Sequence, residues 1–264
     1  MNDIKLLAVD IDGTLINSKR VLTEKTVCAV KKLLDKGGKF VLSTGRPYQG
    51  ITEIVKTLGL EGMPYILYNG AMVVTFGKPV YSLTIEPELS KKIAREGHDR
   101  NSTQICWANN KLYSEKYDEK IEFYKSISGV EPIIVKDLTE LSEQGITKFV
   151  WYDDPVSTKA YYAQMSERYG NQINLHPSRV DFLEFVNKDC SKATALKTVL
   201  NYYGLSRENC AAIGDGFNDL SMLEYAGISV AMGNAEDEVK ARCKVVTSSC
   251  DQDGVAEFIE RFVL

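Results

Sequence analysis

Two groups of acidic residues near opposite ends of the 264-residue chain could carry chemistry. Asp10 and Asp12 stand in the segment DIDGT, directly after an apolar run, and Asp215 and Asp219 stand in the segment GDGFND. Several carboxylates that meet without matching bases repel one another unless a cation lies among them. Hard carboxylate oxygens with few other ligands favour Mg²⁺, which usually keeps several waters and binds substrate phosphate oxygens. The sequence therefore predicts a magnesium site for a phosphorylated substrate.

The pair Asp10 and Asp12 predicts covalent chemistry. Their spacing directs both side chains to one face if the strand stays regular through both residues. One carboxylate can attack phosphorus to form an acyl phosphate, which divides one hard step into two, while its neighbour transfers protons. An isolated pair of this kind is more often a turn with solvated acids. Here the pair ends an apolar run and continues directly into Gly13 and Thr14, which makes it more specific.

Polar residues at other places could bind a phosphoryl group. Thr44, in the segment STGRP, offers a hydroxyl donor, and Lys192, just ahead of a predicted helix, offers a fixed positive charge. Arg46 follows Thr44, and Asn69 ends another apolar run. Each residue has a plainer explanation when taken alone, such as a surface lysine, an ordinary strand end or a turn cap. Their occurrence together and in order favours a functional site.

Strand and helix patterns alternate in the first third of the chain. Apolar runs at residues 4–9, 39–42 and 65–68 predict strands, and helical spacing of apolar residues predicts helices at 23–34 and 49–58. This alternation is typical of a parallel sheet with right-handed crossovers. Ligands collect at the carboxyl ends of such strands, and the polar clusters described above fall at those ends.

The rest of the chain contains an insertion and then a return to the same alternation. Residues 83–186 contain a predicted hairpin around Asn109 and Asn110, further strand-like runs and two helices, which is typical of an α+β domain with an antiparallel sheet. Residues 187–264 alternate helix and strand again. The predicted fold class is α/β, with a parallel-sheet core at residues 1–82 and 187–264 and an inserted α+β domain at residues 83–186.

Four segments resemble the four motifs of the haloacid dehalogenase superfamily. They are DIDGTL at residues 10–15, STGRP at 43–47, SKATAL at 191–196 and GDGFND at 214–219. Their order, with an insertion between the second and the third, is similar to that of the Cof-type phosphatases with a class IIB cap, the YidA-like sugar phosphatases. The segments YNGA at 68–71 and VAMGNA at 230–235 also resemble segments common there, whereas Ala193 stands where many relatives have glycine. The resemblance implies a Rossmann-like core with a mobile cap, whose closure would exclude bulk water.

The resemblance also implies a role for each motif residue. Asp10 would be the nucleophile and a Mg²⁺ ligand, and Asp12 would be the general acid and base and bind Mg²⁺ through its backbone carbonyl. Asp215 would be the carboxylate ligand from the fourth motif, and Asp219 would bind the metal directly or hold its waters. The phosphoryl group would be contacted by the Ile11 backbone N–H, Thr44, Gly45, Lys192 and Asn218. In related ion-pumping ATPases, the position of Asp12 resembles threonine, and the phosphoenzyme is long-lived. An aspartate at this position therefore favours rapid hydrolysis of the phosphoenzyme.

Four residues are weaker candidates for contacts with the substrate. Arg46 and Asn69 lie within or beside the motif segments, and His176 and Arg179 lie near a predicted strand start in the insertion. Arg46 could instead pair with a surface acid, and Asn69 could cap a turn. For His176 and Arg179, a surface position is the plainer interpretation.

The leading interpretation is a Mg²⁺-dependent phosphatase for small phosphorylated metabolites, with sugar phosphates as the expected class and a phosphoaspartyl intermediate on Asp10. A covered site suits small molecules better than phosphoproteins. One alternative is a phosphomutase of the same capped type, which would need a bisphosphate activator and release an isomer. Another is a receiver-type signalling module, in which a phosphorylated aspartate lies beside acids, a hydroxyl and a lysine, although a receiver needs no inserted domain.

Composition excludes several other classes of protein. The 32 lysine and arginine residues against 36 aspartate and glutamate residues give a formal net charge of -4, which does not supply the basic surface that nucleic-acid binding needs. Uninterrupted apolar stretches span only a few residues, so no membrane segment is expected. Six scattered cysteines without a CxxC pair, and an N-terminus without a signal-peptide pattern, predict a cytoplasmic protein with reduced thiols. The sequence gives no indication of an oligomeric state.

Overall fold

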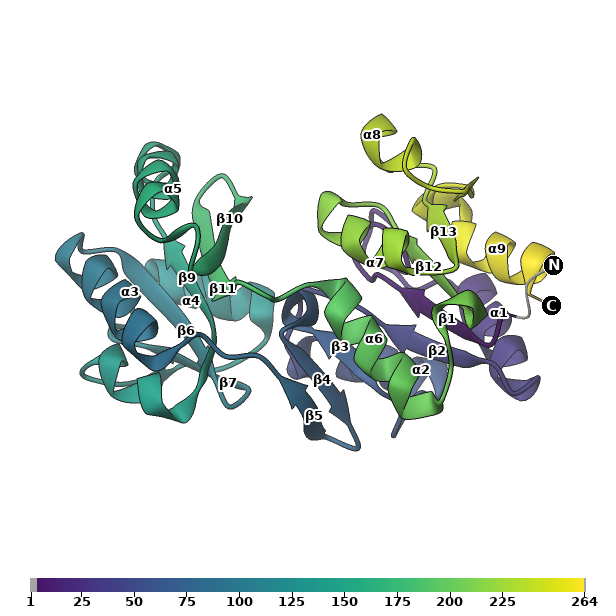
Figure 1. Ribbon diagram of the computed structural model, residues 1–264, viewed down its shortest axis with the longest axis horizontal. Helices are drawn as coiled ribbons and strands as arrows, with labels where there is room; N and C mark the ends of the chain where they lie inside the picture. The colour runs from purple at the N-terminus through teal and green to yellow at the C-terminus, as the bar shows by residue number, and fades with distance from the viewer. Residues whose placement is uncertain (1–3, 264) are drawn as a thin grey trace. The chain divides into compact units, whose positions relative to one another are not determined.

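The computed structural model describes residues 4–263, which divide into two compact units (Figure 1). The core unit contains the described residues of Met1–Arg46, Ile51–Tyr81 and Ser191–Leu264, and the inserted unit contains Pro47–Gly50 and Ser82–Cys190. The sequence predicts the limits of the insertion at residues 83 and 186, so the structural unit is longer at both ends and includes a short segment from the first third of the chain. Residues 1–3 and 264, which the predicted core limits include, lie outside the described residues.

A five-stranded parallel sheet forms the centre of the core unit, in the order β14-β13-β12-β1-β2. Its strands are β1 (Leu6–Val9), β2 (Lys39–Leu42), β12 (Cys210–Gly214), β13 (Ile228–Ala231) and β14 (Val245–Val246). Within β1, Leu6 pairs with Cys210 on one side and with Lys39 on the other. Every residue of β1 is buried, which explains why this strand is a continuous apolar run.

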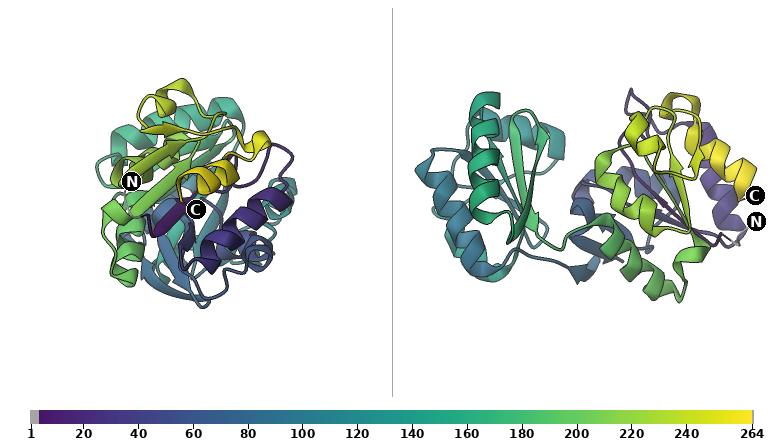
Figure 2. Two further views of the ribbon diagram at one scale, coloured as in Figure 1. Left: turned by 90° about the vertical axis from the view of Figure 1, so that its right-hand side faces the viewer. Right: turned by 45° about the horizontal axis from the view of Figure 1, so that its top comes forward.

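Helices cover both faces of this sheet (Figures 1 and 2). They are α1 (Glu24–Asp35), α2 (Thr52–Leu58), α6 (Lys192–Tyr203), α7 (Leu220–Tyr225), α8 (Asp237–Lys240) and α9 (Gly254–Phe262). Side chains of α6 and α7 pack in one apolar cluster with Leu6 and Ala8 of β1. Helices α1 and α9 contact each other and lie on the opposite side of the sheet (Figure 1). The predicted α/β class with a parallel-sheet core is confirmed.

The third strand predicted from the sequence does not join the parallel sheet. Strand β3 (Tyr65–Leu67) pairs antiparallel with β4 (Met72–Thr75), and β5 (Lys78–Ser82) completes a separate three-stranded sheet. A parallel bridge between Ser43 and Ile66 links β3 to the end of β2. The chain turns back after β3 because Tyr68 and Asn69 have φ angles of 52° and 55°, left-handed values that cannot continue a strand. The strand is therefore present and runs parallel to the end of β2, as expected, but along its length it pairs with β4.

The inserted unit is built on a six-stranded sheet in the order β10-β11-β9-β6-β7-β8. Its antiparallel strands are β6 (Thr103–Ala108), β7 (Lys111–Ser114), β9 (Ile146–Tyr152), β10 (Ile173–Arg179) and β11 (Phe182–Asn187), and the short β8 (Ile133–Ile134) pairs parallel with β7. Its helices are α3 (Pro87–Asp99), α4 (Glu119–Ser128) and α5 (Pro155–Tyr169). Side chains of α3 and α5 share one apolar cluster with residues of β6, β9 and β11.

The predicted α+β character of the insertion is confirmed, including the hairpin between β6 and β7. Asn109 and Asn110 form its turn with φ angles of 49° and 59°, which asparagine tolerates better than most residues. Among residues 4–263, no helix combines the length and the apolar composition needed to cross a membrane.

Candidate active site

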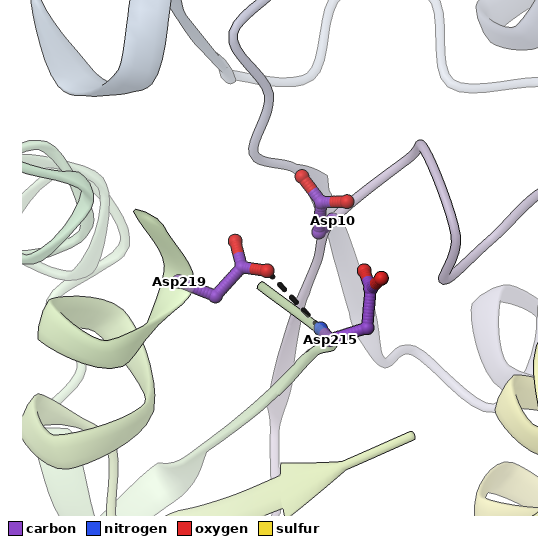
Figure 3. A group of neighbouring side chains, drawn as sticks. All are labelled: Asp10, Asp215 and Asp219. Atoms are coloured by element: carbon purple, nitrogen blue, oxygen red, sulfur yellow. Dashed lines mark hydrogen bonds between the residues drawn. The ribbon is translucent and has the colours of Figure 1, made fainter. Parts of the chain in front are cut away.

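The carboxyl ends of β1 and β12 bring three acidic side chains together. Asp10 follows β1 directly, Asp215 follows β12, and Asp219 ends the short helix η5 (Phe217–Asp219). Each offers one carboxylate oxygen, and these three atoms all lie within 4.8 Å of one another. Figure 3 shows the three carboxylates gathered at one place from separate segments of the chain. Asp10 and Asp219 are buried and Asp215 is partly buried, so water screens their mutual repulsion poorly.

Lys192 places a positive charge inside this cluster. The side chain of Ser191 caps α6, which makes Lys192 the first residue of the helix. The Lys192 side chain is fully buried, and its Nζ donates to Asp10 Oδ1 at 2.6 Å, to Asp219 Oδ1 at 2.5 Å and to the Ser43 carbonyl at 3.0 Å. Three carboxylates and one ammonium leave two negative charges when all four are ionised. A divalent cation would balance that charge.

Burial changes the protonation of these groups. It raises the pKa of Asp10 to about 8, with Asp219 and Asp215 adding to the rise and Lys192 opposing it. Burial also raises the pKa of Asp215, although the hydroxyl of Thr14 opposes this. Burial alone would lower the pKa of Lys192, but the carboxylates of Asp10 and Asp219 raise it above its usual value. A cation bound among the carboxylates would favour their ionised forms, and this donor set of hard oxygens fits Mg²⁺.

Asp215 is held by the loop after β1 and by Asn234, which the motifs do not single out. Thr14 Oγ1 donates to Asp215 Oδ1 at 2.7 Å. Asn234 Nδ2 donates to the Gly13 carbonyl at 2.8 Å and to Asp215 Oδ2 at 3.4 Å. Asn234 Oδ1 accepts the backbone N–H of Cys250 at 2.8 Å, so one amide side chain joins three loops. Its place in the segment VAMGNA is the only signal by which sequence reasoning could have found it.

Two glycines make room for the acidic side chains. Gly13 has a φ of +78°, and a Cβ there would lie 2.4 Å from Asp215 Oδ2. A Cβ on Gly214 would lie 2.6 Å from the Cβ of Asp219. Asp219 Oδ2 also accepts the backbone N–H groups of Asp215 at 3.1 Å and Gly216 at 3.0 Å. Asp219 thereby fixes the shape of this loop with one oxygen and contacts the lysine with the other.

Asp12 lies beside this cluster, with its side chain paired to Arg46. Arg46 Nε donates to Asp12 Oδ2 at 2.8 Å, and its Nη2 donates to Asp12 Oδ1 at 2.5 Å. The Asp12 side chain is 54% exposed and that of Arg46 is 27% exposed, so the pair remains in contact with water. Ile11 between the two aspartates is buried. Arg46 therefore holds the carboxylate that the sequence assigns to proton transfer.

The structure also brings together four of the residues expected to contact phosphate or substrate. Thr44 is buried, and its backbone carbonyl accepts the Asn69 N–H at 2.9 Å. A Cβ on Gly45 would lie 3.2 Å from the Asn69 amide, so this side chain passes directly beside the Gly45 backbone. Asn218 Nδ2 donates to Asn69 Oδ1 at 3.3 Å, which joins the loop after β12 to the turn after β3.

The two candidates in the insertion lie on the β10–β11 hairpin of the inserted unit. His176 pairs across the ladder with Glu184, and its Nε2 lies 3.9 Å from Glu184 Oε2. Arg179 donates through Nε to Asp181 Oδ1 at 2.9 Å, and its guanidinium lies 5.0 Å from the centre of the Phe182 ring. The positive charge of Arg179 is thus already shared between an acid and an aromatic ring.

Comparison with known proteins identifies similar chains along nearly the whole length. A family model described as haloacid dehalogenase-like hydrolase matches residues 7–259. The 5-amino-6-(5-phospho-D-ribitylamino)uracil phosphatase YitU of Bacillus subtilis is 28% identical, over 97% of each chain. The crystal structure of TM0651 from Thermotoga maritima superposes with a TM-score of 0.91 at 30% identity, covering 99% of this chain and 98% of that one. A subclass IIB sugar phosphatase, BT4131, superposes with a TM-score of 0.82 at 25% identity, over 98% of each chain.

Proposed function

The chain belongs to the haloacid dehalogenase-like hydrolases and is a phosphatase, and we propose that it hydrolyses small sugar or sugar-alcohol phosphates with the help of Mg²⁺. The observation that carries this proposal is the position of Asp10. Its carboxylate is buried, lies 2.6 Å from the Lys192 ammonium and belongs to a group of three acids that can hold one cation. A nucleophile for phosphorus needs this combination of a free lone pair, a nearby positive charge and little water.

We assign the metal site to carboxylates that already meet in the structure. Asp10 and Asp215 would bind Mg²⁺ directly, together with the backbone carbonyl of Asp12, and Asp219 would bind it directly or through its waters. When bound, Mg²⁺ would neutralise charge on the phosphoryl oxygens and so allow an anion to attack another anion. Thr14 and Asn234 would keep the Asp215 carboxylate in position, because each donates to one of its oxygens.

The first step of the proposed reaction transfers the phosphoryl group to the protein. A carboxylate oxygen of Asp10 attacks phosphorus, a new P–O bond forms, and the bond from phosphorus to the substrate oxygen breaks. Asp12 enters this step protonated and gives its proton to the leaving oxygen, so the rest of the substrate departs as a neutral alcohol. Lys192 and the hydroxyl of Thr44 stabilise the phosphoryl oxygens, and the backbone N–H of Ile11 adds another donor.

The second step releases inorganic phosphate. Asp12, now a carboxylate, takes a proton from water while the water oxygen attacks phosphorus, and the bond between phosphorus and Asp10 breaks. Arg46 holds both oxygens of Asp12 in the structure, so Asp12 must exchange part of this contact for the substrate or the water. Asp12 therefore supplies both proton transfers and returns to its starting state at the end of the cycle.

The substrate class is supported by two relatives. The name of the Bacillus subtilis relative specifies a phosphorylated ribityl group, and the solved structure of subclass IIB belongs to a sugar phosphatase. We extend the proposal to this chain because the similarity covers both the core and the insertion. Five cysteines are free thiols in the structure, which supports a reducing compartment such as the cytoplasm; they are Cys28, Cys106, Cys210, Cys243 and Cys250.

A phosphate-release assay tests this function. We expect release from sugar and sugar-alcohol phosphates with Mg²⁺ and none with EDTA, and we expect Asp10→Asn to abolish release while the chain remains folded. Asp12→Asn should instead accumulate a phosphoenzyme, detectable by an increase in intact mass, because the second step lacks its base. Near-normal turnover by Asp10→Asn would contradict the covalent step. Isomerisation that depends on an added bisphosphate would show a phosphomutase instead.

A further inference from the structure

The turn that follows β3 in the core unit has a strained backbone. Tyr68, Asn69 and Gly70 have consecutive φ angles of 52°, 55° and 101°, all in the left-handed region, which a bulky residue such as tyrosine rarely adopts. Leu67 pairs with Met72, and loops of this length between antiparallel strands are most often built around a type I turn, whose central φ angles are negative. Reversing the chain therefore does not require the strain. Such strain collects at functional sites and persists where the surrounding structure enforces it.

Backbone hydrogen bonds to the loop after β2 enforce this conformation. The Tyr68 N–H donates to the Arg46 carbonyl at 3.3 Å, and the Asn69 N–H donates to the Thr44 carbonyl at 2.9 Å. The Tyr68 side chain is buried, which anchors the turn. Thr44 carries a hydroxyl proposed to bind the phosphoryl group, and Arg46 donates to both carboxylate oxygens of Asp12. The turn therefore fixes the backbone of two residues that the proposed reaction uses.

The side chain of Asn69 reaches two more groups proposed to contact phosphate. Its Oδ1 accepts a hydrogen bond from Asn218 Nδ2 at 3.3 Å. A Cβ on Gly45 would lie 3.2 Å from the Asn69 amide, so this amide lies directly beside the Gly45 backbone. Asn69 thereby joins the loop after β12 to the loop after β2.

Gly70 places the turn against the start of α6. A Cβ on Gly70 would lie 2.1 Å from the Ser191 carbonyl oxygen and 2.8 Å from the Lys192 backbone nitrogen, so only glycine allows this close approach. Helix α6 also contacts β3 and β4, the strands on either side of the turn (Figure 1). Lys192 is the first residue of α6. The turn therefore borders the lysine proposed to bind phosphate.

We propose that the turn at residues 68–70 determines the geometry of the groups that bind the phosphoryl oxygens, and that Asn69 is a positioning residue that orients Asn218. This inference rests on the proposed phosphatase function and gives Asn69 a role other than contact with the substrate. Several donors must meet the phosphoryl oxygens at once, and a misplacement of about 1 Å can cost about 100-fold in rate. These donors come from the loop after β2, the loop after β12 and the start of α6, and the turn contacts all three.

The metal site is held by other contacts. Thr14 and Asn234 donate to the Asp215 carboxylate. Backbone N–H groups of its own loop donate to Asp219. A change at Asn69 should therefore weaken phosphate binding without weakening Mg²⁺ binding, whereas a change at Asn234 should weaken Mg²⁺ binding. A general loss of structure would instead affect both ligands.

Asn69→Gly tests this role, because glycine keeps the left-handed backbone and removes only the amide side chain. In the full-length protein, calorimetry would measure the affinity for Mg²⁺ alone and for inorganic phosphate at saturating Mg²⁺. We expect the phosphate affinity to fall about tenfold, because the hydrogen bond that orients Asn218 is lost. The Mg²⁺ affinity should stay within about twofold, because the contacts of the acids are independent of Asn69. The kcat/KM for p-nitrophenyl phosphate should fall about 10- to 100-fold, because the donors no longer match the transition state.

A double-mutant cycle shows whether Asn69 acts through Asn218 or on phosphate itself. If Asn69 orients Asn218, then Asn69→Gly should weaken phosphate binding by less in the Asn218→Ala protein than in the unmodified one. Losses that add in full would mean that Asn69 contacts phosphate independently, which would overturn the positioning role.

Asn101→Gly is the matched control. Asn101 also has a left-handed φ, of 53°, but it is exposed and belongs to the inserted unit, so its change should alter neither affinity. An unchanged phosphate affinity in Asn69→Gly, or equal losses of phosphate and Mg²⁺ affinity, would also overturn the positioning role. If the unmodified protein binds no inorganic phosphate at saturating Mg²⁺, the proposed phosphatase site itself fails, which is a different result from a failure of the turn.

Discussion

Replacing Lys192 by methionine would remove the only positive charge among the described contacts of Asp10 and Asp219. Methionine has a similar length and remains compatible with a buried, helical position, so the main change is the loss of charge. Two buried carboxylates would then face each other and Asp215 without compensation. Removing one partner of a buried ion pair costs about 3–5 kcal/mol. For a chain of this size that corresponds to a fall in Tm of roughly 6–20 °C, at about 2–4 °C per kcal/mol.

The sign of the pH dependence distinguishes this explanation from a simple packing defect. Burial already raises the pKa of Asp10 to about 8, and losing Lys192 removes the main influence that lowers it, so the pKa should rise further. A raised pKa stabilises the folded state below the ordinary value of 3.8, and this stability is lost as the pH rises through the folded value. The two folded proteins differ in the protonation of Asp10 only above about pH 8, so the deficit of Lys192→Met should change little between pH 5 and 7 and grow as the pH rises through 8.

Thermal and urea unfolding in EDTA would measure this deficit, with Lys240→Met as the matched control. Lys240 pairs with an almost fully exposed Asp237 at 3.4 Å, so its loss should cost less than about 1 kcal/mol. Adding Mg²⁺ should stabilise Lys192→Met more than the unmodified protein, because the ammonium no longer competes with the cation for Asp10. A deficit below about 1 kcal/mol at pH 8, or one that grows as the pH is lowered to 5, would refute the reasoning.

Three further predictions concern the same site. The affinity for Mg²⁺ should rise as the pH is raised from 6 to 8, because the pKa of Asp10 is about 8 and binding must displace its proton; calorimetry in two buffers would detect the released proton. Asn234→Ala should weaken Mg²⁺ binding about 10- to 100-fold, since it no longer orients a metal ligand, whereas Asn201→Ala on the exposed surface of α6 should not. Gly13→Ala should abolish Mg²⁺ binding, whereas Gly37→Ala, with a similar φ of +85° and no atom within 4 Å of the new Cβ, should only lower the Tm.

The positions of the acidic residues could be read from the sequence because of a simple property of parallel sheets. Asp10 and Asp215 each end an apolar run, and neighbouring parallel strands end at the same edge. The order of the strands brings β1 and β12 side by side, so the two residues meet although 204 residues separate them in the chain. Lys192 could be predicted in a similar way, because the sequence pattern places it at the start of a helix, and α6 does begin at this residue.

Other features could not be read from the sequence because they depend on contacts between distant loops. Asn234 is exposed and lies in a loop, and nothing in its neighbourhood in the sequence indicates that it reaches Gly13. The pairing of Asp12 with Arg46 depends on the turn after β2, which local patterns do not describe. Lys148 on β9 and Glu184 on β11 form a buried ion pair, with Nζ 3.2 Å from Oε1, whereas a charged residue in a strand first suggests the exposed side of a sheet.

The third strand shows that a correct local pattern does not give every partner of a strand, because the pairing of β3 with β4 was not expected. The apolar run at Tyr65–Leu67 is a strand, as the pattern indicates. Its partner was decided by the left-handed turn at Tyr68 and Asn69, which sends the chain into an antiparallel pairing with β4. Side-chain periodicity carries no information on which strand lies next to another.

The central strand of the core unit has its neighbours on opposite sides of the insertion, and this affects the order of events during synthesis. On one side β1 pairs with β12, which begins at Cys210. The strands of the six-stranded sheet in the inserted unit pair with one another and all lie within Thr103–Asn187. Domains generally fold as they leave the ribosome. We therefore expect the later-starting insertion to be complete while the first strand still exposes an unpaired edge, a hazard for aggregation that chaperones would have to cover. Nascent chains that end before Asp215 lack two of the three clustered carboxylates, so we expect them to bind no divalent cation at this site.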